Sequence, residues 1–133
     1  MYCTQQDMII EFGERELIQL TDTDGIGVLN FAVLNNAIRM GAAQIDGYIS
    51  KFLPLTAVPD HINYKNRYLA WYDLSKFSMN DKMLAGKSSI EKHLMAIGRG
   101  EMPLGNESNT STDLSTGFTF IASDQVIFGN AQW

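Results

Sequence analysis

One long segment shows the helical repeat of apolar residues more clearly than any other part of the chain. The repeat consists of Phe31, Leu34, Ile38, Ala42, Ile45, Tyr48 and Phe52. Spacings of three and four residues place these side chains on one face of an α-helix, with polar residues on the other face. Such a helix has to bury its apolar face against other elements. We therefore predict a long helix that begins after an N-cap at Asn30 and ends near Phe52.

Four further segments have the apolar spacing and end signals of helices. The first follows Thr4, with Asp7 at the capping-box position, and ends at Gly13. The second covers about 14–21. The third covers about 61–78 after a candidate N-cap at Asp60, and the fourth covers about 81–97. We predict an all-α fold, a bundle of four to five helices.

The composition changes after the last predicted helix. Gly, Asn, Ser and Thr dominate up to residue 117, and an apolar tail with a short β-strand signal at 118–122 follows. The tail could fold back on its own bundle, but so long a polar loop favours an extended arm that binds a partner. The predicted arm residues are Phe118, Phe120, Val126, Ile127, Phe128 and Trp133. The predicted organisation is a helical domain over 1–98, a flexible loop over 99–117 and the arm over 118–133.

Charge is distributed in three blocks. Residues 1–51 hold seven acidic and three basic residues, 60–99 hold four and seven, and 101–133 hold four and none. The total of −5 argues against a simple electrostatic binder of nucleic acid, whereas the alternation suits contacts between copies of the chain. We predict subunit contacts between two groups of side chains: Lys82, Lys87 and Lys92 on one copy, and Glu11, Glu14 and Glu16 on the next.

An alternative function is a small regulator that binds nucleic acid through basic helices. Its basis is a set of basic and aromatic residues that are interleaved: Lys65, Arg67, Tyr68, Trp71, Tyr72 and Lys76. Such a set could bind a single strand by stacking and charge. The interpretation that we favour is that the aromatic residues belong to the core and the basic side chains are solvated. Steep salt dependence of DNA binding would support the regulator.

The segment 21–27 is rich in Asp and Gly. Asp22, Asp24 and Gly27 match the start of a calcium loop, but Val33 stands at the twelfth position, where such a loop needs a glutamate. We therefore predict a turn in which the aspartates cap the backbone, and no metal site.

No catalytic or cofactor-binding motif is recognisable. Cys3 is the only cysteine, which excludes an internal disulfide and a cysteine zinc cluster. His61 and His93 lie on different predicted helices, and we interpret them as surface or capping residues. We predict no enzyme activity, no catalytic residue and no cofactor. No signal peptide and no membrane span is predicted either.

Several motifs occur in the order found in a small protein family of Mu-like phages and prophages. They are the stretch from Tyr2 to Asp22, Asp24-Gly25-x-Gly27, Val33-Leu34-x-x-Ala37-Ile38 and Ile45-Asp46-Gly47-Tyr48-Ile49. The resemblance includes Pro54-Leu55 and Val58-Pro59, and it is weaker over 60–98. It returns at Leu104-Gly105 and Val126-Ile127-Phe128.

This family resembles the helical head–tail adaptor, or connector, proteins of long-tailed phages. The resemblance implies a structural virion protein, with no catalytic residues to carry over. It implies a ring, commonly of twelve subunits, that binds the portal protein above and a stopper or tail component below, while DNA passes through the lumen. The implied location is the head–tail junction of the virion, and the host cytoplasm during assembly. It implies no membrane partner.

Overall fold

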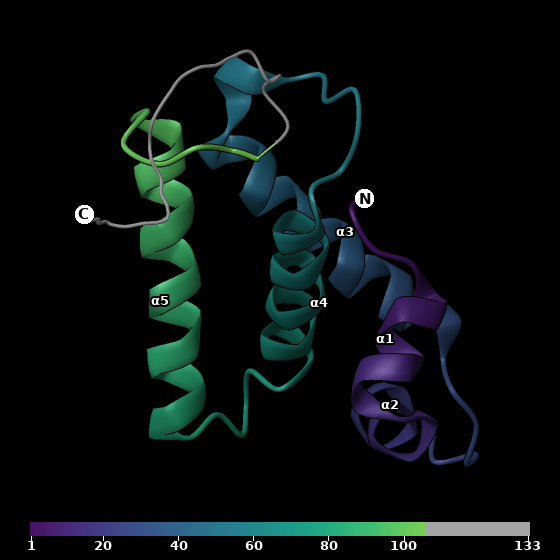
Figure 1. Ribbon diagram of the computed structural model, residues 1–133. Helices are drawn as coiled ribbons and strands as arrows, with labels where there is room; N and C mark the ends of the chain where they lie inside the picture. The colour runs from purple at the N-terminus through teal and green to yellow at the C-terminus, as the bar shows by residue number, and fades with distance from the viewer. Residues whose placement is uncertain (106–133) are drawn as a thin grey trace. The chain divides into compact units, whose positions relative to one another are not determined.

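The computed structural model describes residues 1–105, and 106–133 lie outside the described part. The described residues form five α-helices, one short 3-10 helix and no β-strand, which confirms the predicted all-α fold. All these helices belong to one compact unit, Met1–Met102 (Figure 1). The predicted arm residues Phe118, Phe120, Val126, Ile127, Phe128 and Trp133 lie outside the described residues. The arm and the three-part division of the chain therefore stay predictions.

The two N-terminal helices, α1 (Gln5–Phe12) and α2 (Glu14–Thr21), lie where the sequence predicts them. The capping box is present, because the Asp7 N–H donates to Thr4 Oγ1 at 3.0 Å and the Thr4 N–H donates to Asp7 Oδ2 at 2.9 Å. Gly13 separates the helices with φ of 86°. Glycine adopts this conformation without strain, so the chain can turn sharply there.

Helix α3 spans Phe31–Tyr48, and Oδ1 of its predicted N-cap Asn30 accepts the Val33 N–H at 3.2 Å. The predicted stripe is buried at Leu34, Ile38, Ala42 and Ile45, and half-buried at Tyr48 and Phe52. Phe31, however, is 50% exposed, so its place on the buried face was wrongly predicted. It occupies the first turn of α3, one turn before the buried part of the stripe begins.

The predicted end of α3 near Phe52 is also wrong. Ile49 leaves the helical conformation, and a 3-10 turn over Ser50–Phe52 follows. A long-range contact lies at this point: a β-carbon at Gly98 would collide with the carbonyl oxygen of Tyr48. Close packing of the C-terminal end of the last helix against the end of α3 thus accompanies the change of backbone conformation.

Helix α4 spans Asp60–Leu74, and α5 spans Asp81–Gly98. The N-cap of α4 is Pro59, so Asp60 is not the cap but the first helical residue, where its charge suits the helix dipole. Helix α4 ends four residues before the predicted Ser78, because the Ser75 N–H donates to the Trp71 and Tyr72 carbonyls and begins a turn.

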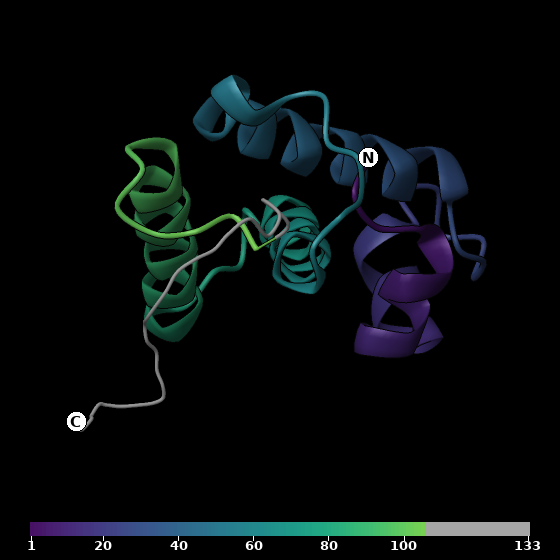
Figure 2. The same ribbon diagram turned by 45° about the horizontal axis from the view of Figure 1, so that its top comes forward.

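Helix α4 contacts α1, α3 and α5. Both ribbon views show α4 between α5 on one side and the α1–α2 pair on the other (Figures 1 and 2). Helix α3 runs behind α4 in Figure 1 and across the top in Figure 2. Gly41 of α3 permits close approach, because a β-carbon there would lie 2.9 Å from Asn66 Nδ2 and 3.2 Å from Leu69 Cβ. In the described part of the chain, no helix combines the length and apolar character needed to cross a membrane.

Candidate functional site

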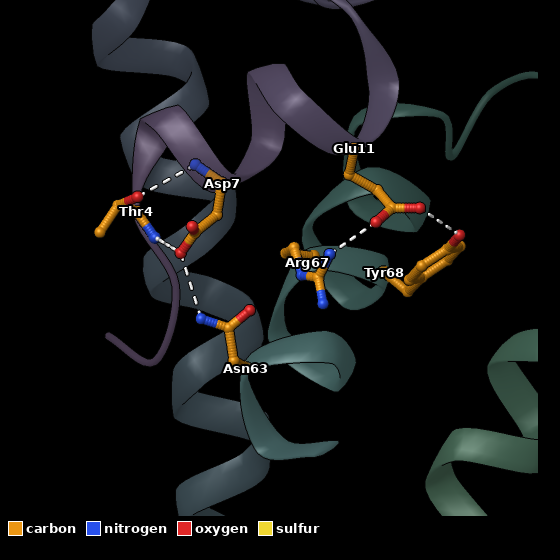
Figure 3. A network of polar contacts seen from close by, with 6 residues as sticks. All are labelled: Thr4, Asp7, Glu11, Asn63, Arg67 and Tyr68. Carbon is orange, nitrogen blue, oxygen red and sulfur yellow. Dashed lines mark hydrogen bonds and ion pairs between the residues drawn. The ribbon is translucent and has the colours of Figure 1, made fainter. Parts of the chain in front are cut away.

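Polar side chains of α1 and α2 contact α4, and we call these contacts the N-terminal clamp. Figure 3 shows the contacts that α1 makes. Its first contact joins Asn63 to the capping box, since Asn63 Nδ2 donates to Asp7 Oδ2 at 3.1 Å. The backbone N–H of Thr4 and the Asn63 amide together hold the pKa of Asp7 below its usual value. The carboxylate that starts α1 therefore also fixes α1 to α4.

The second contact of the clamp is centred on Glu11. Arg67 Nη1 lies 2.5 Å from Glu11 Oε1, and the Tyr68 hydroxyl donates to Glu11 Oε2 at 2.9 Å (Figure 3). Burial, and then this hydrogen bond, raise the pKa of Tyr68 to about 12. The Tyr68 hydroxyl therefore remains a protonated donor at neutral pH.

The third contact joins Trp71 Nε1 to Glu16 Oε2 at 3.2 Å. Of the three acids predicted for subunit contacts, Glu11 and Glu16 thus bind α4 of their own chain, and Glu14 is exposed. An acid held in this way still presents negative charge at the surface, but its side chain is less free to reorient toward a neighbour. The predicted contact between subunits stays a prediction, and Glu14 is its one acid without a hydrogen bond or ion pair to another side chain within residues 1–105.

Asn66 is fully buried beneath the clamp. Its Oδ1 accepts the N–H groups of Tyr2 at 2.7 Å and Cys3 at 3.1 Å, and its Nδ2 donates to the Ile38 carbonyl at 3.0 Å. A single side chain thus joins the N-terminus, α3 and α4. The buried Cys3 thiol has its pKa raised to about 12, chiefly by burial, so it is not a reactive nucleophile.

The aromatic residues of α4 serve more than one packing surface. Phe12 of α1 stacks on Trp71, with ring centroids 5.1 Å apart, and meets Tyr68 edge-on at 5.2 Å. On the α5 side, a β-carbon at Gly86 would collide with the Tyr72 hydroxyl. Phe77 falls within the predicted helix over 61–78, but it lies beyond the observed end of α4 and is 94% exposed.

The residues proposed for nucleic-acid binding do not form a free basic face. Lys65 is buried, Arg67 pairs with Glu11, and Tyr68 and Trp71 pack against Phe12. Stacking of bases requires exposed ring faces. This arrangement favours the interpretation that the aromatic residues are structural, and it gives no support to the regulator.

The three lysines predicted for subunit contacts all belong to α5. Lys82 and Lys92 are exposed, and Lys87 is half-buried. Both views place α5 on the side of α4 opposite to α1 and α2, which carry the three acids (Figures 1 and 2). The helices that carry the two groups therefore lie on opposite sides of α4 within one chain.

A pocket of about 530 Å³ between α4 and α5 was not predicted. We call it the aromatic groove, and its wall consists of Tyr68, Trp71, Tyr72, Asn80, Lys82, Met83 and Gly86. The signal in the sequence was Gly86, a glycine inside a predicted helix, which is typical of a position where another chain segment approaches closely. The spacing of residues along the sequence, however, did not identify which side chains would lie beside Gly86.

The two histidines, interpreted from the sequence as surface or capping residues on different helices, are both half-buried and lie next to each other. Their rings stack with centroids 5.6 Å apart, between α4 and α5. Lys65 Nζ also lies 2.9 Å from His61 Nδ1. Residues on different helices became neighbours because α4 and α5 pack side by side.

The histidine pair predicts a loss of stability in weak acid. Burial, the Lys65 charge and His61 all lower the pKa of His93 below its ordinary value of 6.5. As pH falls below 6.5, His93 is protonated in the unfolded chain before it is protonated in the folded chain. The free energy of unfolding therefore decreases between pH 6.5 and the lower pKa of the folded chain. Urea unfolding at pH 7.5 and 5.5 should show the decline. His93→Gln should reduce it, and an equal decline in that variant would contradict the assignment.

The predicted turn at 21–27 is confirmed. Asp22 Oδ1 accepts the Ile26 N–H at 3.0 Å, and Oδ2 accepts the Gly27 N–H at 2.7 Å. Both carboxylate oxygens therefore cap the backbone, whereas Asp24 is exposed. Within residues 1–105, no group of three or more His, Cys, Asp or Glu side chains is placed to hold a metal ion.

The comparisons with known proteins give one positive finding. A family model described as Bacteriophage Mu, Gp36 matches residues 2–122. The match includes all five α-helices and extends beyond the described residues. No curated protein sequence matches the chain.

Proposed function

The chain belongs to the bacteriophage Mu Gp36 family, and from that premise we propose that it is a head–tail adaptor of a phage particle. Family membership itself indicates a structural or assembly role in a phage. The proposal adds that copies of the chain form a ring between the portal protein and the neck or tail, through which DNA passes. The chain would act by binding its neighbours and would have no enzyme activity.

The observation that carries the ring is the separation of charge across the subunit. Helices α1 and α2 together carry four acidic residues and one basic residue, and α5 carries three lysines and two acidic residues. Helix α4 stands between the net-acidic pair and the net-basic helix (Figure 1). Two complementary groups on opposite sides of one subunit suit a head-to-tail contact, which closes into a ring when the rotation between copies allows it. Charged pairs of this kind set orientation and specificity more than affinity.

Exposed apolar side chains also support contacts with other proteins. Ile26 and Val28 are more than half exposed, and Phe31 is 50% exposed. The three residues lie close together in the sequence, between the end of α2 and the first turn of α3. Phe77 is 94% exposed in the turn between α4 and α5. Contiguous exposed apolar patches mark interaction surfaces, and these residues are the candidates for such contacts.

The proposed partners are other copies of the chain and the neighbouring components of the particle. The ring would be a homo-oligomer, of twelve copies as the resemblance implies, with the portal protein on one side and a stopper or tail component on the other. It would be located at the head–tail junction of the virion, after assembly in the host cytoplasm. DNA would be a partner only by passage through the lumen.

Charge reversal on α5 tests the contact between subunits. The triple variant Lys82→Glu, Lys87→Glu, Lys92→Glu should retain its helical circular dichroism, because two of these lysines are exposed and none of the three makes a hydrogen bond or ion pair within residues 1–105. It should give far fewer joined particles, since glutamates would face the acids of the next copy. Electron microscopy of lysates from phage that carry the variant provides the measurement.

A matched control reverses lysines elsewhere on the chain. Lys51→Glu with Lys76→Glu changes the net charge in the same sense at two exposed positions outside α5. This control should assemble as the wild type does. If the α5 variant also produced a normal number of joined particles, the charge-paired contact would be lost from the proposal.

A further inference from the structure

Lys65 of α4 is a buried cation, only 4% exposed. Its Nζ contacts His61 Nδ1, and among residues 1–105 the one ion pair joins Arg67 and Glu11. No carboxylate in this part of the chain therefore neutralises Lys65. Buried lysines are normally paired, because an uncompensated charge in a protein interior is costly. Burial accordingly lowers the pKa of Lys65.

A pocket of about 230 Å³ lies beside this lysine, between α4 and α5. Its polar side chains are Tyr64, Lys65, Tyr72, Ser89 and His93, and we call it the donor pocket. Each of these side chains can donate a hydrogen bond, and none is a carboxylate. The other lining residues are Gly86 and Ile90. The wall is thus suited to a ligand that accepts hydrogen bonds and carries negative charge.

The position of the Tyr72 hydroxyl in the donor pocket is fixed by packing against α5. Any β-carbon at position 86 would collide with its hydroxyl, so Gly86 creates the space in which the hydroxyl lies against α5. Burial raises the pKa of Tyr72, and the hydroxyl therefore keeps its proton at neutral pH. The donor pocket consequently combines the Lys65 Nζ, which a bound anion would favour in its charged form, with a protonated hydroxyl at a fixed place.

We propose that the donor pocket binds a small oxyanion, of the size of inorganic phosphate or a short carboxylate, through Lys65, with hydroxyl groups of the wall as further donors. A hydrogen bond between two charged groups is among the strongest in proteins. The volume lies below the roughly 300 Å³ at which sites for drug-sized ligands begin, which favours a small ion. This binding does not depend on the adaptor role, since all its residues belong to one chain.

Calorimetric titration of the full chain tests the proposal. The probes are potassium phosphate and potassium acetate at pH 7.5, with potassium chloride at equal ionic strength as the control. Saturable binding of either oxyanion, accompanied by a rise in melting temperature that chloride does not give, supports the site. The two arms distinguish a phosphate site from a carboxylate site. Absence of saturable binding in both arms overturns the proposal.

Variants locate the binding. Lys65→Met keeps the apolar stem and should weaken binding about tenfold or more, the worth of a hydrogen bond to a charged group. Lys76→Met removes an exposed lysine just beyond α4 and should leave binding unchanged. Tyr72→Phe retains the ring and should weaken binding severalfold. This variant tests the site if Lys65→Met does not fold. Binding that survives unchanged in whichever of the Lys65 and Tyr72 variants folds overturns the assignment.

Discussion

Asn66→Ala is expected to lower the free energy of unfolding by about 3 kcal/mol, because three hydrogen bonds are lost and each buried group left unpaired costs roughly 1–3 kcal/mol. The backbone N–H groups of Tyr2 and Cys3 lose their acceptor, and the Ile38 carbonyl loses a donor from α4. The truncation also leaves a cavity in the core, which adds to the cost. Urea unfolding followed by circular dichroism provides the measurement.

Asn63→Ala is the matched control, since Asn63 lies one turn earlier on α4, is half-buried, and its side chain makes one hydrogen bond within residues 1–105, to Asp7. Its expected cost is about 1 kcal/mol or less. Equal losses in the two variants would mean that the buried amide does not hold the N-terminus, α3 and α4 together. The difference between the variants therefore measures the interior contact separately from the surface contact.

Deletion of residues 113–133 is expected to block the joining of heads to tails while leaving the helical signal intact. The five helices all end by Gly98, so the deletion removes none of them. It does remove the predicted arm residues Phe118, Phe120, Val126, Ile127, Phe128 and Trp133. Complementation of a phage that lacks the gene, followed by counting of joined and unjoined particles, provides the measurement.

A second variant separates apolar contact from chain length. Replacement of Phe118, Phe120, Phe128 and Trp133 by Ser keeps all 133 residues and should cause the same block. Full assembly with the truncated chain would refute the arm. A block by truncation alone, with normal assembly of the serine variant, would show that the segment acts by its length and not by its apolar side chains.

The helices could be predicted from the sequence because their signals are local. Thr4 with Asp7 and the side chain of Asn30 cap helices where the pattern places them. The errors arose where distant contacts or turns matter. Helix α3 ends at Tyr48, beside Gly98, instead of continuing to Phe52, and α4 ends before Phe77. Periodicity alone does not contain that information.

The site was less predictable than the fold. Charge blocks indicated which helices carry acids and lysines, but they did not indicate that Glu11 would bind Arg67 within the same chain. The pairing of His61 with His93 and the burial of Lys65 depend on how α4 and α5 pack. Spacing along one helix cannot reveal a partner on another, so these contacts required the structure.

Imaging of assembled particles tests the adaptor role most directly. Cryo-electron microscopy of the particle neck, with and without an antibody fragment against a tag on this chain, would locate its copies. The proposal predicts a closed ring directly below the portal, with α5 of each copy facing α1 and α2 of the next. Joined, infectious particles with no copy of the chain in the neck would contradict the proposed function.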